Sequence, residues 1–178
     1  MRRIRLYIAT SLDGYIARPN GSVDWLESFP NPDQNDYGYQ AFLNEVDTTL
    51  MGRATYQEIL NFGIAFPYAD KVNYVFTRQT GLPDTEFVQF VSTDVVAFIQ
   101  QLKKTSGKDI WLIGGGQLNT LLLQHGLLDE MIITIVPLVL GNGISLFAPS
   151  TLEKKMILTE NQTFKSGFVQ LSYQQIHN

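Results

Sequence analysis

The sequence predicts an α/β protein with a mostly parallel sheet, helices on both faces of that sheet, and an antiparallel edge. Through the middle of the chain, short apolar segments alternate with helical segments, which is typical of parallel strands joined by crossover helices. The last two extended segments, 155–164 and 167–176, are joined by a short polar turn, which predicts an antiparallel pair. No repeat, low-complexity tract or linker divides the 178 residues, so we expect a single domain over residues 1–178.

The first part of the chain begins with a strand and continues through turns. Residues 4–11, "IRLYIATS", are largely apolar and predict a buried strand, and "YIA" at 15–17 resumes extended structure after a break at "LDG". The turn "RPNG" is followed by Ser22, which is suited to cap a short helix. Apolar residues recur at helical spacing in "YGYQAFLNEV", so we expect a helix over 37–46.

The middle of the chain contains the strand and helix alternation. A strand ending at Met51 is followed by Gly52 and a helix, and further strands are expected at 71–79 and 86–91. The segment 92–107 has the charge pattern of a helix, with Ser92 or Thr93 as its cap.

The same alternation continues toward the end of the chain. A strand at 109–114 leads into a helix at 116–126 that ends at a glycine. The apolar run "MIITIVPLVL" at 131–140 predicts a long strand that could pair or pack across a two-fold axis.

Composition excludes several classes of protein. A net charge of −4 without a long Lys/Arg run argues against nucleic-acid binding. The absence of cysteine rules out disulfides and thiolate metal sites, and His125 and His177 have no metal-ligand spacing, so we expect no metal. No apolar run reaches the roughly 20 residues of a membrane span, and the N-terminus lacks a signal-peptide pattern. We therefore expect a soluble, cytoplasmic protein without a membrane partner.

Three junctions at predicted strand ends are suited to bind a phosphorylated ligand. They are Gly52-Arg53-Ala54-Thr55, Thr77-Arg78 and Gly114-Gly115-Gly116-Gln117. Glycine lets a phosphate approach the backbone, a helix N-terminus favours an anion, and arginine adds bidentate hydrogen bonds. In open α/β sheets, ligands bind beyond the carboxyl ends of the strands, so the junctions together predict a nucleotide site. The alternative is that the glycines only make turns and that the arginines are solvated surface residues.

A dinucleotide-binding Rossmann domain is disfavoured. Gly114 and Gly116 fit the first two positions of its fingerprint, but Asn119 stands at the third, and the run comes late in the chain. No Gly-Lys-Ser/Thr follows the glycines, so there is no P-loop either.

The order of these motifs resembles the dihydrofolate reductase-like superfamily, and most closely the C-terminal reductase domain of the bifunctional riboflavin biosynthesis protein. The motifs that carry the resemblance are Ser11-Leu12-Asp13-Gly14 with Ile16-Ala17, Gly52-Arg53 with Thr55, Gly114-Gly115-Gly116, Asp129-Glu130, and Pro137-Leu138-Val139-Leu140-Gly141 with Gly143. They span nearly the whole chain. The resemblance implies a three-layer fold with a twisted, mainly parallel sheet of eight strands, a stand-alone member without the zinc deaminase domain, and a homodimer.

The resemblance also implies NADPH as cofactor and assigns residues to its parts. Phosphate and adenosine contacts would come from Gly52, Arg53, Ala54 and Thr55, and the 2′-phosphate would be held by Thr77 and Arg78. The pyrophosphate would be cradled by Gly114, Gly115, Gly116, Gln117 and Leu118, and the nicotinamide would be lined by Ala9, Ile16 and Ala17. The Gly114–Gly115 peptide is expected to be cis, as it is in this superfamily.

The implied reaction is hydride transfer to a small heterocyclic or ribosylamino-pyrimidine-like substrate, similar to that of 5-amino-6-(5-phosphoribosylamino)uracil reductases. Asp13 is expected to contact substrate or to orient a proton-donating water; the alternative is that it supports the turn before Gly14. Trp25, Phe42 and Tyr56 could wall the substrate pocket, or belong to the core instead. A substrate phosphate would need cations, for which Lys71 and Lys165 are candidates by charge alone.

Two other functions remain open. A dihydrofolate reductase is disfavoured because Pro30 stands where its substrate-binding carboxylate is expected after Trp25, and Glu27 does not match that spacing. A nucleotide-binding dimer that has lost catalysis is the other alternative.

Overall fold

The computed structural model describes residues 1–151 and 153–176, and its strands fall into two sheets. The strands of the large sheet are β1 (Ile4–Ser11), β3 (Val46–Gly52), β4 (Val72–Phe76), β5 (Val88–Val91), β6 (Asp109–Gly114), β7 (Glu130–Val136), β9 (Met156–Thr163) and β10 (Val169–Gln175). The small sheet pairs β2 (Tyr15–Ala17) with β8 (Ile144–Ser145). The helices are η1 (Asp24–Ser28, a 3-10 helix), α1 (Tyr39–Glu45), α2 (Arg53–Asn61), α3 (Val95–Leu102) and α4 (Gly116–Gln124).

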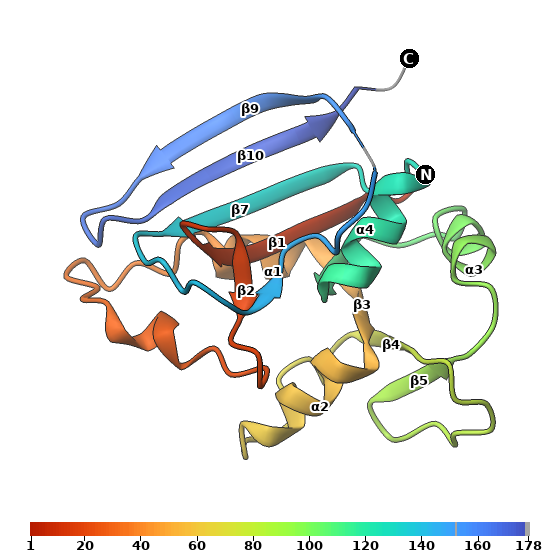
Figure 1. Cartoon of the computed structure of the whole chain (residues 1–178). Coiled ribbons are helices and arrows are strands. Elements are labelled where there is room, and N and C mark those ends of the chain that lie inside the picture. The colour runs from red at the N-terminus through yellow and green to blue at the C-terminus, as the bar shows by residue number, and fades with distance from the viewer. Residues whose placement is uncertain (152, 177–178) are drawn as a thin grey trace.

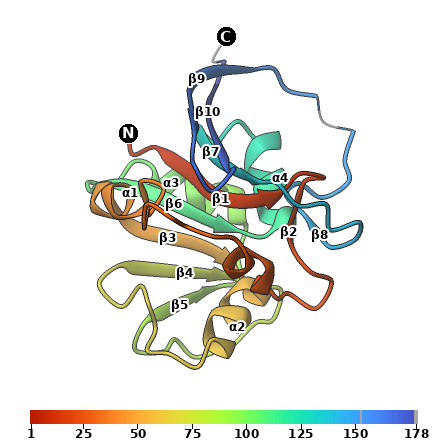
Figure 2. The same ribbon diagram turned by 90° about the vertical axis from the view of Figure 1, so that its left-hand side faces the viewer.

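The large sheet has the order β5-β4-β3-β6-β1-β7-β10-β9 (Figure 1). Neighbours from β5 to β7 are parallel, whereas β10 is antiparallel to both β7 and β9. Figure 2 shows the sheet from β9 at one edge to β5 at the other, with β2 and β8 beside it. The predicted mostly parallel sheet with an antiparallel edge is confirmed.

Helices pack on both faces of this sheet because successive side chains of a strand point to opposite faces. On β6, Ile110 and Leu112 face one core cluster, to which α3 and α4 contribute, whereas Trp111 faces a second cluster with Phe42 of α1. A third cluster joins Ile59 of α2 to the strands β3 and β4. In Figure 1, α4 lies in front of the sheet and α1 behind it.

Local details differ from the sequence-based expectation at two helix starts. The cap of α3 is Asp94, whose carboxylate accepts hydrogen bonds from the amides of Val96 and Ala97, so the prediction of Ser92 or Thr93 is wrong. Asp94 is favoured at the cap position over Ser92 and Thr93 because its negatively charged carboxylate interacts favourably with the positive end of the helix dipole. The 3-10 helix η1 has Val23 rather than Ser22 at its cap position.

The strand β7 is an interior strand, with β1 on one side and β10 on the other. Both rows of its backbone hydrogen-bonding groups are therefore occupied within the chain. Edge-to-edge pairing of residues 131–136 across a two-fold axis is excluded by this arrangement, whereas packing of the segment "MIITIVPLVL" across such an axis stays a prediction.

Buried arginines join the strands at the amino ends of the parallel sheet. Arg5 of β1 pairs with Glu130 of β7 and Glu45 of α1, and its guanidinium lies over the ring of Phe42 at 5.0 Å. Such a network is costly to break, because removing one partner leaves a buried charge uncompensated. Within the described part of the chain, no helix is long and apolar enough to cross a membrane.

Candidate functional site

A groove of about 1420 Å³ opens at the carboxyl ends of the parallel strands. Its lining comes from the ends of four of them, through Ala9 on β1, Gly52 on β3, Thr77 after β4 and Gly115 after β6. Usual small-molecule pockets occupy roughly 300–1,000 Å³, so this groove has room for a dinucleotide together with a second ligand. The three junctions singled out in the sequence thus converge on one groove.

The first two junctions form the cationic part of the groove. Gly52 caps α2 without a side-chain hydrogen bond, which leaves the amide groups of the first turn of α2 available to an anion. Arg53 donates a hydrogen bond to Gln79, which joins the β3–α2 junction to the β4 junction. Arg78 is exposed beside it, and within the described residues no carboxylate pairs with either arginine.

The three glycines of the third junction meet three different requirements. Gly114 has a φ of +117°, a conformation that L side chains rarely adopt, and the Gly114–Gly115 peptide is cis, as expected. A Cβ on Gly116 would lie 2.3 Å from the carbonyl oxygen of Ser145, so this position is filled by neighbouring backbone. Gly115 lines the groove, and a Cβ there would approach only the Thr55 hydroxyl at 3.5 Å.

Thirteen of the fourteen residues expected to bind the cofactor line this one groove. Gly114 does not line it and instead sets the backbone direction before α4. The lining residues are Ala9, Ile16, Ala17, Gly52, Arg53, Ala54, Thr55, Thr77, Arg78, Gly115, Gly116, Gln117 and Leu118.

The Asp13 carboxylate is held by hydrogen bonds within the chain, and Asp13 does not line the groove. Its carboxylate accepts hydrogen bonds from the Ser11 hydroxyl at 2.6 Å and from the amides of Leu140 and Gly141 at 3.0 and 2.8 Å. These hydrogen bonds, led by the one from Ser11, lower the pKa of the Asp13 carboxyl. The arrangement ties the β1–β2 turn to the segment before β8, which favours a supporting role over direct substrate contact.

The three aromatic residues expected to wall the substrate pocket are packed elsewhere. Trp25 is 2% exposed against Val136 and Phe168, and Phe42 of α1 is 3% exposed against Trp111. Tyr56 packs edge-to-face on Phe66 and Phe90. None of the three lines the groove, so the alternative of core packing describes them.

Other groove residues carry no local sequence signal for a site. Along α2 and its C-cap residue Phe62, a stripe faces the groove at the i, i+3, i+4 and i+7 spacing of one helix face, formed by Thr55, Glu58, Ile59 and Phe62. This spacing could have been recognised once Gly52 had been placed at a strand end. Further lining comes from Tyr7, Val23, Leu26, Tyr68 and Ile113, which belong to segments far apart in sequence.

Two of these residues are phenols that burial keeps in their neutral form. Burial raises the pKa of Tyr7 to about 12 and also raises the pKa of Tyr68. The Tyr7 hydroxyl donates to the carbonyl oxygen of Tyr37 at 2.8 Å. This wall of the groove is therefore uncharged across the physiological pH range.

The candidate phosphate-binding lysines and the candidate carboxylate Glu27 lie outside the groove lining. Lys71 donates to the carbonyl oxygens of Leu43 and Val46 at 3.1 and 3.2 Å. Lys165, in the loop between β9 and β10, pairs with Asp33 at 2.9 Å. Neither lysine therefore contributes a charge to the groove lining.

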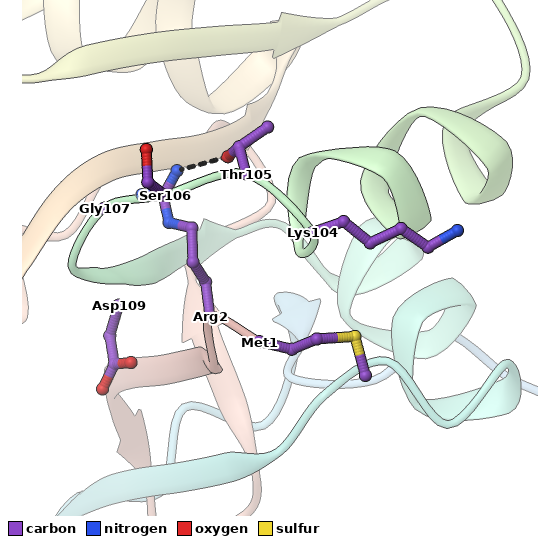
Figure 3. Close-up of a pocket in the computed structure, with 7 residues that line it drawn as sticks. All are labelled: Met1, Arg2, Lys104, Thr105, Ser106, Gly107 and Asp109. Atoms are coloured by element: carbon purple, nitrogen blue, oxygen red, sulfur yellow. Dashed lines mark hydrogen bonds between the residues drawn. The ribbon is translucent and has the colours of Figure 1, made fainter.

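A second, smaller cavity of about 490 Å³ lies at the amino ends of the strands (Figure 3). The buried Arg2 dominates it and donates to Thr105, Thr48, Asp47 and the carbonyl oxygen of Lys108. The side chain of Lys104 extends away from Arg2 in Figure 3. Because Arg2 is fully engaged by the chain itself, this cavity is part of the strand connections rather than a ligand site.

No cluster of three or more His, Cys, Asp or Glu side chains in residues 1–151 and 153–176 could hold a metal ion. His125 is exposed at the end of α4, and His177 lies outside the described residues.

Comparisons with known proteins match nearly the whole chain. The family model of the RibD C-terminal domain matches residues 2–170. The uncharacterized protein YwjB of Bacillus subtilis (strain 168) is 43% identical over 172 residues, covering 97% of both chains.

Solved structures share the fold over the whole chain. A crystal structure from Shewanella sp. PV-4, of a protein provisionally assigned to riboflavin biosynthesis, superposes with a TM-score of 0.88 at 32% identity, covering 98% of this chain and 99% of that one. The deaminase/5-amino-6-(5-phosphoribosylamino)uracil reductase of Thermotoga maritima has a TM-score of 0.73 at 16% identity. That match covers 98% of this chain and 57% of the Thermotoga chain, and at this identity it shows the fold alone.

Proposed function

The chain belongs to the RibD C-terminal domain family, and from this membership and the geometry of the groove we propose that it is an NADPH-dependent reductase of a pyrimidine-like heterocycle. Family membership supports an oxidoreductase of the pyrimidine reductase type. One observation carries the cofactor assignment: three separate strand-end junctions, with two arginines that pair with no carboxylate among the described residues, line a single groove. A doubly charged dinucleotide with a further phosphate matches that arrangement.

The residues present fit this cofactor. The first turn of α2, with Arg53 and Arg78 beside it, offers amides and guanidinium groups to phosphate oxygens. Gly115 at the start of α4 leaves its backbone open to the groove, so that a pyrophosphate could approach it. When bound, NADPH supplies a hydride from C4 of its nicotinamide ring.

The chain's own contribution is binding and orientation. Ala9, Ile16 and Ala17 present small and apolar surfaces at which a flat ring can lie against the β1 end. Reduction of a C=N or C=O bond places the hydride on carbon and a proton on the heteroatom, leaving NADP⁺. The residues of the groove must therefore align the two rings while keeping a path for a proton from water.

The test is a titration with NADPH and with NADH, followed by the fluorescence of Trp25 and Trp111. If Arg53 and Arg78 both contact the 2′-phosphate, which only NADPH carries, the double variant Arg53→Ala/Arg78→Ala should weaken NADPH binding by at least about tenfold and NADH binding much less, because hydrogen bonds to charged groups contribute about 1.5–3 kcal/mol each. The matched control Lys104→Ala/Lys155→Ala removes two exposed positive charges outside the groove and should change neither affinity. Absence of saturable NADPH binding to the wild-type protein would overturn the proposal, and equal losses for the two cofactors would overturn the role of the arginines.

A further inference from the structure

We propose that the groove takes a substrate that bears amino groups but no phosphate, and that Glu58 binds the amino edge of that substrate. This inference rests on the proposed reductase function and extends it to the class of substrate. It follows from the distribution of charge along α2 and from the neutral residues that line the rest of the groove.

Charge in the groove is divided along one helix. Of the residues that line it, three are charged: Arg53, Arg78 and Glu58. Arg53 begins α2 and Arg78 follows β4, so both lie at the phosphate-binding junctions. Glu58 is five residues after Arg53, which places it about 7.5 Å further along the helix axis. The positive and negative parts of the groove are thus separate.

Glu58 is a carboxylate without a cationic partner. Within the described residues it makes no ion pair, and its hydrogen bond from the Asn61 amide is long, at 3.5 Å. The side chain is half-buried, because the loop before η1 lies against it. At Gly21 of that loop, where φ is +91°, a Cβ would lie 2.6 Å from the Glu58 carboxyl carbon.

A half-buried carboxylate in this position favours a ligand that donates hydrogen bonds. An unpaired charge loses hydration on burial, and this loss is offset when donors occupy its oxygens. Amino groups on a flat heterocycle are donors of this kind. The remaining walls near the β1 end, from Tyr7, Val23, Leu26, Tyr68 and Ile113, are neutral and largely flat or apolar.

The same distribution of charge disfavours a phosphate on the substrate. The proposed function assigns the two arginines of the groove to the cofactor phosphates, and neither Lys71 nor Lys165 lines the groove. A substrate phosphate near Glu58 would face a like charge at short range, which disfavours binding. Glu58 therefore selects against the phosphorylated form as well as for the amino edge.

Two probes that differ only by a phosphate provide the test: 5-amino-6-(5-phosphoribosylamino)uracil and the same molecule with its phosphate removed. We expect calorimetric titration of the protein saturated with NADP⁺, which cannot reduce either probe, to show at least about tenfold tighter binding of the dephosphorylated form. Glu58→Gln keeps the size of the side chain and removes its charge. It should weaken binding of the dephosphorylated probe by about tenfold and reduce the difference in affinity between the two probes. Glu160→Gln, an identical change at an exposed site on β9 outside the groove, should alter neither affinity.

The outcomes separate this inference from the proposed function. Tighter binding of the phosphorylated probe, no binding of either probe, or a Glu58→Gln protein that binds both probes as the wild type does would each overturn the role of Glu58, even if NADPH binds normally. Loss of NADPH binding would instead overturn the cofactor assignment. The urea midpoint of Glu58→Gln, measured alongside, should match that of the wild type, so that weaker probe binding reports recognition rather than unfolding.

Discussion

Gly116→Ala should destabilise the protein because the space beside Gly116 is already filled by backbone. An added Cβ would lie 2.3 Å from the carbonyl oxygen of Ser145, whereas carbon and oxygen atoms in ordinary contact stay about 3.3 Å or more apart. One of the two segments must therefore move by about 1 Å. Ser145 cannot move freely, because β8 pairs with β2 and the Ala148 amide donates to Thr120 of α4 at 2.8 Å.

The expected cost follows from this overlap. Overpacking of a well-filled site costs typically 1–3 kcal/mol, and for a chain of this length each kcal/mol lowers the unfolding midpoint by about 2–4 °C. We expect Gly116→Ala to lose about 1–3 kcal/mol in urea denaturation followed by circular dichroism, and roughly 2–12 °C in thermal unfolding. Alanine is otherwise the better helix former, so any loss reports the contact rather than helix propensity.

Gln117→Ala is the matched control for this prediction. Gln117 is exposed in the same first turn of α4, and its truncation adds no atoms near Ser145. It should stay within about 0.5 kcal/mol of the wild type, as surface substitutions usually do. A Gly116→Ala protein as stable as Gln117→Ala would refute the reasoning, since the segment before Ala148 would then be free to give way.

Two further predictions concern the core and the groove wall. Leu122→Ala, at a fully buried position between α4 and the sheet, should cost about 2–5 kcal/mol in urea denaturation, whereas Leu60→Ala, half-exposed on α2, should cost far less; equal losses would contradict the packing described. Burial raises the pKa of Tyr7 to about 12, above its value of about 10 in the unfolded chain. The contribution of Tyr7 to the free energy of unfolding is therefore complete below pH 10 and is lost as the pH rises toward 12, because the unfolded state ionises first. Ultraviolet titration should show a tyrosine ionising near pH 12 that disappears in Tyr7→Phe, and an unchanged titration curve would contradict this assignment.

The sheet was predictable where a segment carries its own periodicity. The strand β1 was expected over the residues that form it, and β9 and β10 pair as their turn suggested. The strand β8 was missed because two residues are too short to show a period, and it exists only through its pairing with β2. Capping of α3 by Asp94 was misjudged because Ser92, Thr93 and Asp94 are all good caps, and only the course of the backbone decides among them.

The candidate site was predictable where chemistry and position coincide in the sequence. Glycines and arginines that directly follow strands can be recognised from the local sequence, and the parallel sheet brings them together at one edge. The local sequence does not determine whether a side chain points into the core or into the groove of the folded protein. Trp25 and Phe42 therefore could not be assigned to core or pocket from spacing alone, and Glu58 carries no signal until α2 is placed beside the groove.

The helix α2 connects these observations, because its first and second turns present opposite charges to the same groove. Its first turn, with Arg53, offers positive groups, and its second turn, with Glu58, offers a negative one about 7.5 Å away. That separation is fixed by the rise of the helix and by the anchoring of Ile59 in the core beneath it. In the proposed complex, a cofactor phosphate and a substrate amino group would bind at two separate turns of one helix, which is the requirement for aligning a cofactor with its substrate.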